Sequence, residues 1–153
     1  MKTNFQIKEA LYKACEEDTE KRINVIERNL KSIEESRNNE TKSSAGDKYE
    51  TGRAMLQIEE ENNKTQLSQA MIVKHQLRKI NWRKESQIVE LGSLVTTTNG
   101  EYYLSIGLGK ITLNNQDYYC VSAISPIGQK MMNKTAGDEI EFNGAKITIK
   151  EIV

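Results

Sequence analysis

The sequence predicts an α+β protein: a long antiparallel coiled-coil helical hairpin over residues 1–85, then a small antiparallel β domain with one short helix over residues 86–153. Charge density changes near residue 85, because residues 1–85 hold 17 Lys and Arg and 15 Asp and Glu, against 5 and 7 afterwards. Apolar residues recur at helical spacing in the first part only. Seven of the nine glycines and the single proline lie in the second part, which indicates strands joined by turns.

Two long helices are expected in the first part. Apolar or small residues recur there in steps of three and four, at Ile7, Leu11, Cys15, Thr19, Ile23, Ile26, Leu30 and Ile33. After polar residues 37–46, a similar stripe follows at Tyr49, Leu56, Asn63, Leu67, Ala70, Lys74, Leu77 and Asn81. Neither stripe can be buried by its own helix, so we expect the helices to pair antiparallel, with an acidic tip near residues 40–52. Arms of about 35 residues would extend roughly 50 Å.

Short strands separated by turns are expected in the second part. The strands are predicted at Leu91–Thr98, Glu101–Leu108, Lys110–Leu113, Tyr118–Ala123, Glu139–Phe142 and Lys146–Ile152. Asn99-Gly100 and Asn143-Gly144 are typical two-residue hairpin turns. Ser125 followed by Pro126 is typical of a helix start, and this predicts a short helix as far as about Met132.

Composition excludes several classes of function. No apolar run approaches the roughly 18 to 20 residues of a membrane span, and no export signal begins the chain, so we expect a cytoplasmic protein with no membrane partner. Cys15 and Cys120 stand far apart with no other cysteine, which predicts two reduced thiols and neither a disulfide framework nor a zinc site. His75 is the only histidine and lies in a helical context, so no catalytic triad is expected.

Two carboxylates mark the start of the second helix. Asp47 and Glu50 are three residues apart, so their side chains can lie on one helix face with Cβ atoms roughly 5 to 6 Å apart. Such a pair is an incomplete Mg²⁺ site, because magnesium commonly takes one or two protein carboxylates and completes its shell with water and phosphate oxygens. Asp47 as N-cap with Glu50 three residues later is the alternative, and the spacing alone favours this capping interpretation.

Basic and aromatic residues flank the acidic pair. Lys42 and Arg53 lie on either side of it, and Lys48 and Tyr49 lie between its members. These residues are candidates to contact phosphates and a base. A solvated helix end has the same composition.

Two motifs resemble those of one protein family. Ala45-Gly46-Asp47-Lys48-Tyr49-Glu50 is similar to the Gly-Asp-x-x-Glu tip of the bacterial Gre family of transcript cleavage factors. The segment Ser125–Asp138 resembles the Ser-Pro-Ile-Gly…Gly-Lys-x-x-Gly-Asp signature in that family's carboxy-terminal, FKBP-like domain. The order and spacing of the two motifs agree with the family across nearly the whole chain.

The resemblance implies a transcription elongation factor whose partners are RNA polymerase and the 3′ end of backtracked RNA. The helical hairpin would enter the polymerase's secondary channel, where Asp47 and Glu50 would help hold the second Mg²⁺ ion and the attacking water at the polymerase's own active centre. The protein would bind no cofactor tightly, act as a monomer and not be a nuclease by itself. The positions that match the docking motif are Ser125, Pro126, Ile127 and Gly128.

Departures from the family pattern keep other functions open. The family typically carries an acidic residue immediately before Ser-Pro, whereas this chain has Ile124, and Thr51-Gly52 follows Glu50 where Asn-Ala is common. One alternative is a regulator of the same fold that occupies the channel without promoting cleavage. Another is a coiled-coil adaptor with a β-rich binding domain. An independent enzyme has the least support, because no self-sufficient catalytic group of residues is visible.

Overall fold

The chain forms two compact units, each described here by itself. The computed structural model describes the backbone of residues 3–42 and 46–153 and the side chains of residues 3–39 and 50–153. One unit, which we call the arm, is Thr19–His75. The other, the globular unit, combines the residues up to Asp18 with Gln76–Val153, so the arm is inserted within the sequence of the globular unit.

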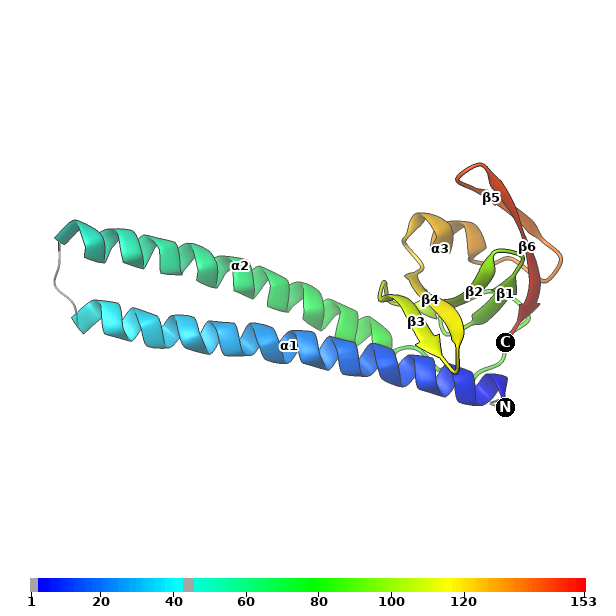
Figure 1. Cartoon of the computed structure of the whole chain (residues 1–153), viewed down its shortest axis with the longest axis horizontal. Coiled ribbons are helices and arrows are strands. Elements are labelled where there is room, and N and C mark those ends of the chain that lie inside the picture. Colours follow the sequence, from blue (N-terminus) through cyan, green and yellow to red (C-terminus); the bar gives the residue numbers. More distant parts are fainter. Residues whose placement is uncertain (1–2, 43–45) are drawn as a thin grey trace. The chain divides into compact units, whose positions relative to one another are not determined.

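The arm consists of two long antiparallel helices, as the apolar periodicity predicts (Figure 1). Helix α1 is Asn4–Lys42, with 39 residues, and α2 is Gly46–Arg78, with 33 residues. The predicted stripes face each other: Ile23, Ile26 and Ala70 are buried in one cluster, against which Leu30 and Leu67 pack. The second stripe ends earlier than expected, because α2 stops at Arg78 and Asn81 is exposed.

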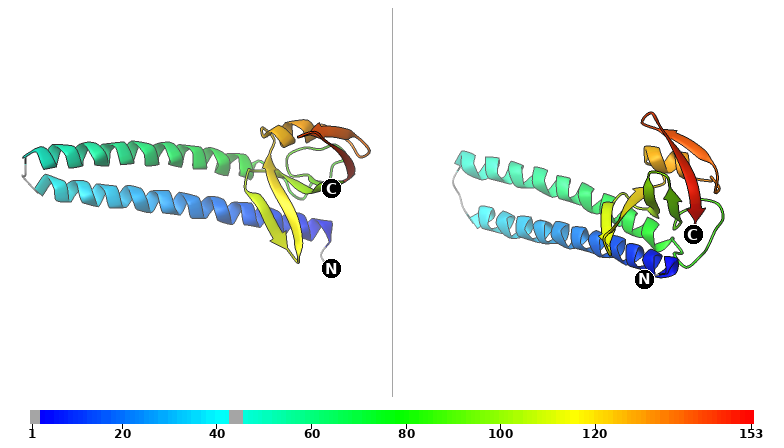
Figure 2. Two further views of the ribbon diagram at one scale, coloured as in Figure 1. Left: turned by 45° about the horizontal axis from the view of Figure 1, so that its top comes forward. Right: turned by 45° about the vertical axis from the view of Figure 1, so that its right-hand side comes forward.

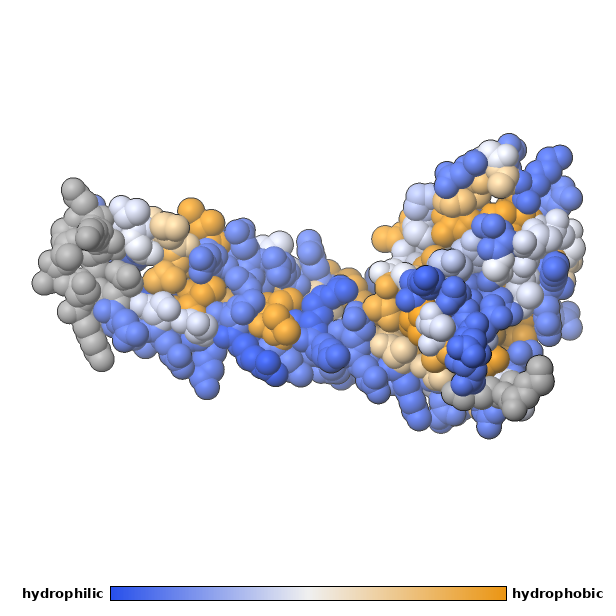
Figure 3. Space-filling model, viewed as in Figure 1, coloured by the Kyte–Doolittle hydropathy of each residue, from blue (hydrophilic) through white to orange (hydrophobic). Residues whose placement is uncertain are grey.

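Polar contacts join the two helices along the same seam. The Lys74 ammonium lies 2.7 Å from a Glu20 carboxylate oxygen. The Asn29 amide donates to the Asn63 side-chain oxygen at 3.5 Å, and further along Arg37 pairs with Glu60. Such pairs fix the register of two helices more than they stabilise them. The face of the arm seen in Figure 3 is mostly hydrophilic with small apolar patches.

The globular unit contains a six-stranded sheet in the order β3-β4-β2-β1-β6-β5. Helix α3, Pro126–Met131, lies between β4 and β5 in the sequence. The strands are β1 (Leu94–Thr97), β2 (Gly100–Ser105), β3 (Gly109–Leu113), β4 (Gln116–Ser122), β5 (Glu139–Phe142) and β6 (Ala145–Ile152).

The sheet is mixed, so the expectation of an antiparallel sheet is wrong in one place. Strands β2 and β4 run parallel, with Tyr103 opposite Cys120, whereas the other neighbours run antiparallel. The cause is the position of β3. Strand β3 lies at the edge of the sheet and pairs only with β4, to which it is antiparallel. The other edge of β4 therefore pairs with β2, and these two strands run in the same direction.

Asparagine shapes the tight turns. Asn143-Gly144 joins β5 to β6 as predicted, and both residues have positive φ, 51° and 78°. Asn114-Asn115 joins β3 to β4 with φ of 50° and 65°, a turn that the sequence analysis missed. In both hairpins the two residues take the left-handed conformation that suits the twist of the flanking strands. Gly100 is the first residue of β2 rather than part of its hairpin loop.

The sheet of the globular unit is covered on both faces. On one face, α3 contributes Ile127 and Met131 to a core that includes, among others, Val95, Leu104, Ile147 and Ile149. On the other face lies the start of α1, and Figure 2 shows this helix beside the β3–β4 hairpin. Both faces of β2 are therefore buried, which explains why its burial does not alternate along Tyr102–Ser105.

Lys8, on the first turns of α1, is only 1% exposed. Its ammonium donates to the backbone oxygens of Lys84 at 2.9 Å and Val153 at 3.1 Å. Burial lowers the pKa of Lys8, although Glu85 and Glu90 act against this shift.

Across residues 3–42 and 46–153, none of the helices has the length and apolar character of a membrane span.

Candidate functional site at the end of the arm

The predicted acidic pair belongs to the first turns of α2. The helix begins at Gly46, so a spacing of three places Asp47 and Glu50 on one helix face. The Glu50 side chain is exposed. The side chains of Asp47, Lys42, Lys48 and Tyr49 lie outside the described ones. The predicted capping contact depends on the Asp47 side chain and therefore also lies outside them.

A pocket of about 350 Å³ opens on the arm one turn beyond Glu50. Its lining residues are Arg37, Arg53, Gln57, Glu60, Glu61 and Lys64. Arg37 and Lys64 both pair with Glu60, and the Lys64 distance is 2.8 Å. Arg53 makes no ion pair with any residue whose side chain is described. The exposed Arg53 guanidinium is thus the group in this pocket best placed to meet an anionic partner.

Sequence reasoning found Arg53 but missed Arg37 and Lys64. The signal is present in the pairing of the two helices, because an antiparallel hairpin brings a residue before the connection opposite one at a similar distance after it. Arg37 and Glu60 follow this rule only in outline, because Arg37 lies five residues before the end of α1 and Glu60 fourteen residues after the start of α2. Applying that symmetry to the charged positions would have placed Arg37 beside the start of α2.

The Ser125-Pro126 segment opens α3 as predicted. The Ser125 hydroxyl accepts a hydrogen bond from the Gly128 amide at 3.1 Å and donates to the Ser122 carbonyl at 2.6 Å. Pro126 occupies the first turn, where a missing amide hydrogen costs nothing. These two hydrogen bonds of the Ser125 hydroxyl fix the start of α3 against the end of β4.

Two of the four predicted docking residues are buried. Ile127 packs in the core between α3 and the sheet. Gly128 approaches β4 so closely that an added Cβ would lie 2.9 Å from the Ser122 carbonyl carbon and nearer still to its oxygen. The exposed residues of this segment are Pro126 and, before it, Ile124, which is 81% exposed. A partner approaching the helix start would therefore meet an apolar surface.

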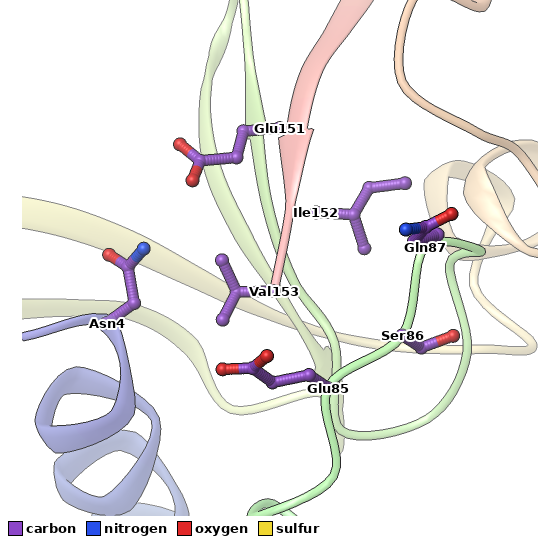
Figure 4. A pocket seen from close by; sticks show the side chains of 7 residues that line it. All are labelled: Asn4, Glu85, Ser86, Gln87, Glu151, Ile152 and Val153. Atoms are coloured by element: carbon purple, nitrogen blue, oxygen red, sulfur yellow. The ribbon is translucent and has the colours of Figure 1, made fainter.

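The globular unit has a separate pocket of about 520 Å³ (Figure 4). It is bounded by the start of α1, the connection after α2 and the end of β6. The lining residues are Asn4, Glu85, Ser86, Gln87, Glu151, Ile152 and Val153. Its charged side chains are two carboxylates, and no nucleophile with an adjacent base lines it.

The two cysteines are reduced thiols, as predicted, and the fold brings them into contact. Cys15 on α1 and Cys120 on β4 are both buried thiols whose Sγ atoms lie 4.0 Å apart. The sequence could not indicate this contact, because 105 residues separate the two cysteines and no local pattern shows which strand packs on α1. Among the described residues, no group of three or more His, Cys, Asp or Glu side chains is arranged to hold a metal ion.

Comparison of the chain with protein-family models, curated proteins and solved structures found no match.

Proposed function

We propose that this protein is a transcription elongation factor that binds RNA polymerase and stimulates the polymerase's cleavage of backtracked RNA. The observation that carries the proposal is the pair of long antiparallel helices whose connection is followed at once by Asp47 and Glu50. The proposal also rests on the resemblance of both sequence motifs to the Gre family.

The length of the arm and the pairing of its helices support the proposed insertion into a channel. From Thr19 to Lys42, the α1 part of the arm runs about 36 Å at 1.5 Å per residue. The apolar cluster around Ile23, Ile26 and Ala70 holds the two helices together, and ion pairs join them on either side of it. A pair of helices bridged in this way resists bending more than a single helix of the same length.

The chemistry requires two carboxylates that reach the metal without filling its coordination shell. In two-metal phosphodiester cleavage one ion activates the attacking water and the other stabilises the leaving oxygen. Asp47 and Glu50 would supply ligands to the loosely held ion, while the polymerase and the RNA would supply the rest. The nearby Arg53 would meet RNA phosphate, with Lys42, Lys48 and Tyr49 as further candidates for contact.

Docking of the globular unit would use the surface before α3. Ile124 and Pro126 are the exposed residues there, whereas Ile127 and Gly128 would act indirectly by shaping the helix start. An apolar residue at position 124 changes the chemistry expected of the partner surface from basic to apolar.

The test uses stalled, backtracked elongation complexes that carry end-labelled RNA. Wild-type protein should shorten the RNA in a Mg²⁺-dependent way, and Asp47→Asn or Glu50→Gln should slow the shortening about 100-fold, the upper range for disturbed metal sites. Glu59→Gln is the matched control, because Glu59 is an exposed carboxylate on the same helix and does not line the pocket beside Arg53. With this variant the polymerase should shorten the RNA at the wild-type rate.

The substitutions also separate catalysis from capping. Asparagine caps a helix as well as aspartate does, whereas alanine costs about 1 kcal/mol at a cap. A purely capping Asp47 would therefore tolerate asparagine in the cleavage assay and lose stability only with alanine. Polymerase binding without RNA shortening by the wild type would instead indicate a regulator that occupies the channel, and no polymerase binding would refute the proposed function.

A further inference from the structure

The contact between Cys15 and Cys120 lies inside the globular unit, between α1 and the sheet. Cys15 is 0% exposed and Cys120 is 1% exposed. Their Sγ atoms are 4.0 Å apart, and the Ser105 hydroxyl oxygen on β2 lies 3.5 Å from the Cys15 sulfur. The two thiols therefore meet at the junction of one helix and two parallel strands.

Packing alone does not account for the composition of this junction. A buried cysteine often serves as a small hydrophobic residue. Here, however, two thiols face each other beside polar groups, namely the Ser105 hydroxyl and the Tyr103 hydroxyl. Among the residues that the structure describes, the fully buried Tyr103 hydroxyl has no hydrogen-bond partner. Burial, together with the charge that either thiolate would carry, raises the pKa of Tyr103, so all three groups interact electrostatically.

The two thiols are not equivalent. The side-chain hydrogen bond between the two thiols lowers the pKa of Cys15, against the opposing effect of burial. The same bond raises the pKa of Cys120, and burial raises it further. Thiolate is the reactive form of cysteine, so Cys15 is the better nucleophile of the pair and Cys120 retains its proton.

We propose that Cys15 and Cys120 are a redox modification site that forms a reversible intramolecular disulfide, tying the start of α1 to β4. A disulfide requires the sulfur atoms to approach to about 2.05 Å, which is about 2 Å closer than in the reduced structure. The necessary movement is small for side chains that already touch. This inference does not depend on the proposed function at the end of the arm.

A peroxide is the chemical class of oxidant that fits a site with so little exposed surface. The Cys15 thiolate attacks one peroxide oxygen, the O–O bond breaks, and the departing hydroxide takes up the proton released by the thiol and leaves as water. Cys15 is then a sulfenic acid. The Cys120 sulfur attacks the Cys15 sulfur, the S–O bond breaks, and the hydroxyl group leaves as water with the Cys120 proton. In total, two thiols are oxidised to one disulfide and hydrogen peroxide is reduced to two waters.

Burial of the two thiols limits the rate of their oxidation, and the disulfide that forms changes the stability of the globular unit. Peroxide reaches the sulfurs only when the start of α1 opens locally from the sheet, so oxidation should be slow compared with that of an exposed thiol. Once formed, the disulfide closes a loop with 104 residues between the two cysteines, and a loop of this size strongly restricts the unfolded chain. The thermal midpoint of the globular unit should rise by about 10 °C.

The experiment treats the reduced, folded full-length chain with hydrogen peroxide and maps its peptides without reduction. Mapping is needed because peroxide also oxidises methionine, of which the chain has five. The expected result is one cross-linked pair of peptides, containing Cys15 and Cys120, in a monomeric product. The thermal midpoint should rise with the cross-link and return to the starting value after dithiothreitol.

Cys15→Ala and Cys120→Ala are the matched controls, and neither should change its midpoint with peroxide. If either variant does not fold, the peptide map of the wild type still decides the question. The proposal is overturned if both thiols of the treated wild type remain open to alkylation after unfolding. It is equally overturned if the products are sulfinic acid or a disulfide between chains, or if the disulfide forms only in urea.

Discussion

The substitution Gly128→Ala tests whether the close approach of α3 to β4 matters for the stability of the protein. Replacing a helical glycine with alanine normally stabilises a protein, by about 1 kcal/mol from helix propensity. Here the added methyl group would meet the Ser122 carbonyl, with the carbonyl carbon only 2.9 Å away. Because this neighbour is backbone, α3 must move, and the movement disturbs both hydrogen bonds of Ser125.

The net change in the free energy of unfolding follows from these opposing effects. Overpacking costs about 1 to 3 kcal/mol, and each weakened hydrogen bond costs about 1 kcal/mol. Against a propensity gain of about 1 kcal/mol, we expect Gly128→Ala to lower the free energy of unfolding by about 2 to 4 kcal/mol. A loss of about 2 kcal/mol corresponds to a roughly 30-fold lower ratio of folded to unfolded protein.

The assay is urea unfolding followed by the fluorescence of Trp82, the only tryptophan. Its ring packs 5.0 Å from the Phe5 ring and beneath the Arg83 guanidinium, so its emission reports on the globular unit. The unfolding midpoint should fall by about 1 M urea. Gly107→Ala is the control, because an added Cβ there has no atom within 4 Å. A Gly128→Ala protein as stable as the wild type would refute the reasoning.

Two further predictions concern the arm and the buried lysine. Ile26→Ala should lower the free energy of unfolding of the arm by about 3 kcal/mol, and its exposed neighbour Val25→Ala should change it by less than about 0.5 kcal/mol, as measured by thermal circular dichroism. Lys8→Met should cost about 1 to 3 kcal/mol at pH 7, because it leaves the Lys84 carbonyl oxygen without a donor, whereas the Val153 oxygen still accepts from the Leu94 amide. The pKa of Lys8 is lower in the folded chain than its ordinary value of 10.5. Between these two pKa values, Lys8 is protonated in the unfolded chain and largely neutral in the folded chain, so raising the pH favours the folded chain. The advantage of wild type over Lys8→Met in urea unfolding should therefore grow from pH 7 to pH 10, and a shrinking advantage would contradict this sign.

Local patterns allowed much of the fold to be predicted. Steps of three and four along α1 identified Ile23 and Ile26 as buried, because helical geometry alone decides which residues share a face. The turn at Asn143-Gly144 and the helix start at Ser125-Pro126 were also predicted correctly. Each depends only on the backbone conformation that these residues favour, positive φ in the turn and a capped first turn in the helix. Asn114-Asn115 was missed because it lacks the glycine of the commonest hairpin turns.

The remaining features depend on contacts between distant parts of the chain. No hairpin signal could report that β2 pairs with β4 in parallel, because a turn determines only the strands that it joins. The burial of Lys8 was equally invisible, since its hydrogen-bond partners are 76 and 145 residues away. At the candidate site, the spacing of Asp47 and Glu50 followed from sequence, whereas Arg37 in the adjoining pocket required the pairing of two helices.

The insertion of the arm into the sequence of the globular unit has a consequence for the order of folding during synthesis. Arm contacts such as Arg37 with Glu60 join residues 23 positions apart, so the helical hairpin can close soon after His75 leaves the ribosome. The start of α1 is synthesised first, but Cys15 must wait for β4 before it is buried. At that stage the arm is folded, whereas Leu11 and Cys15 in the segment synthesised first are still exposed, because the rest of the globular unit that buries them is missing.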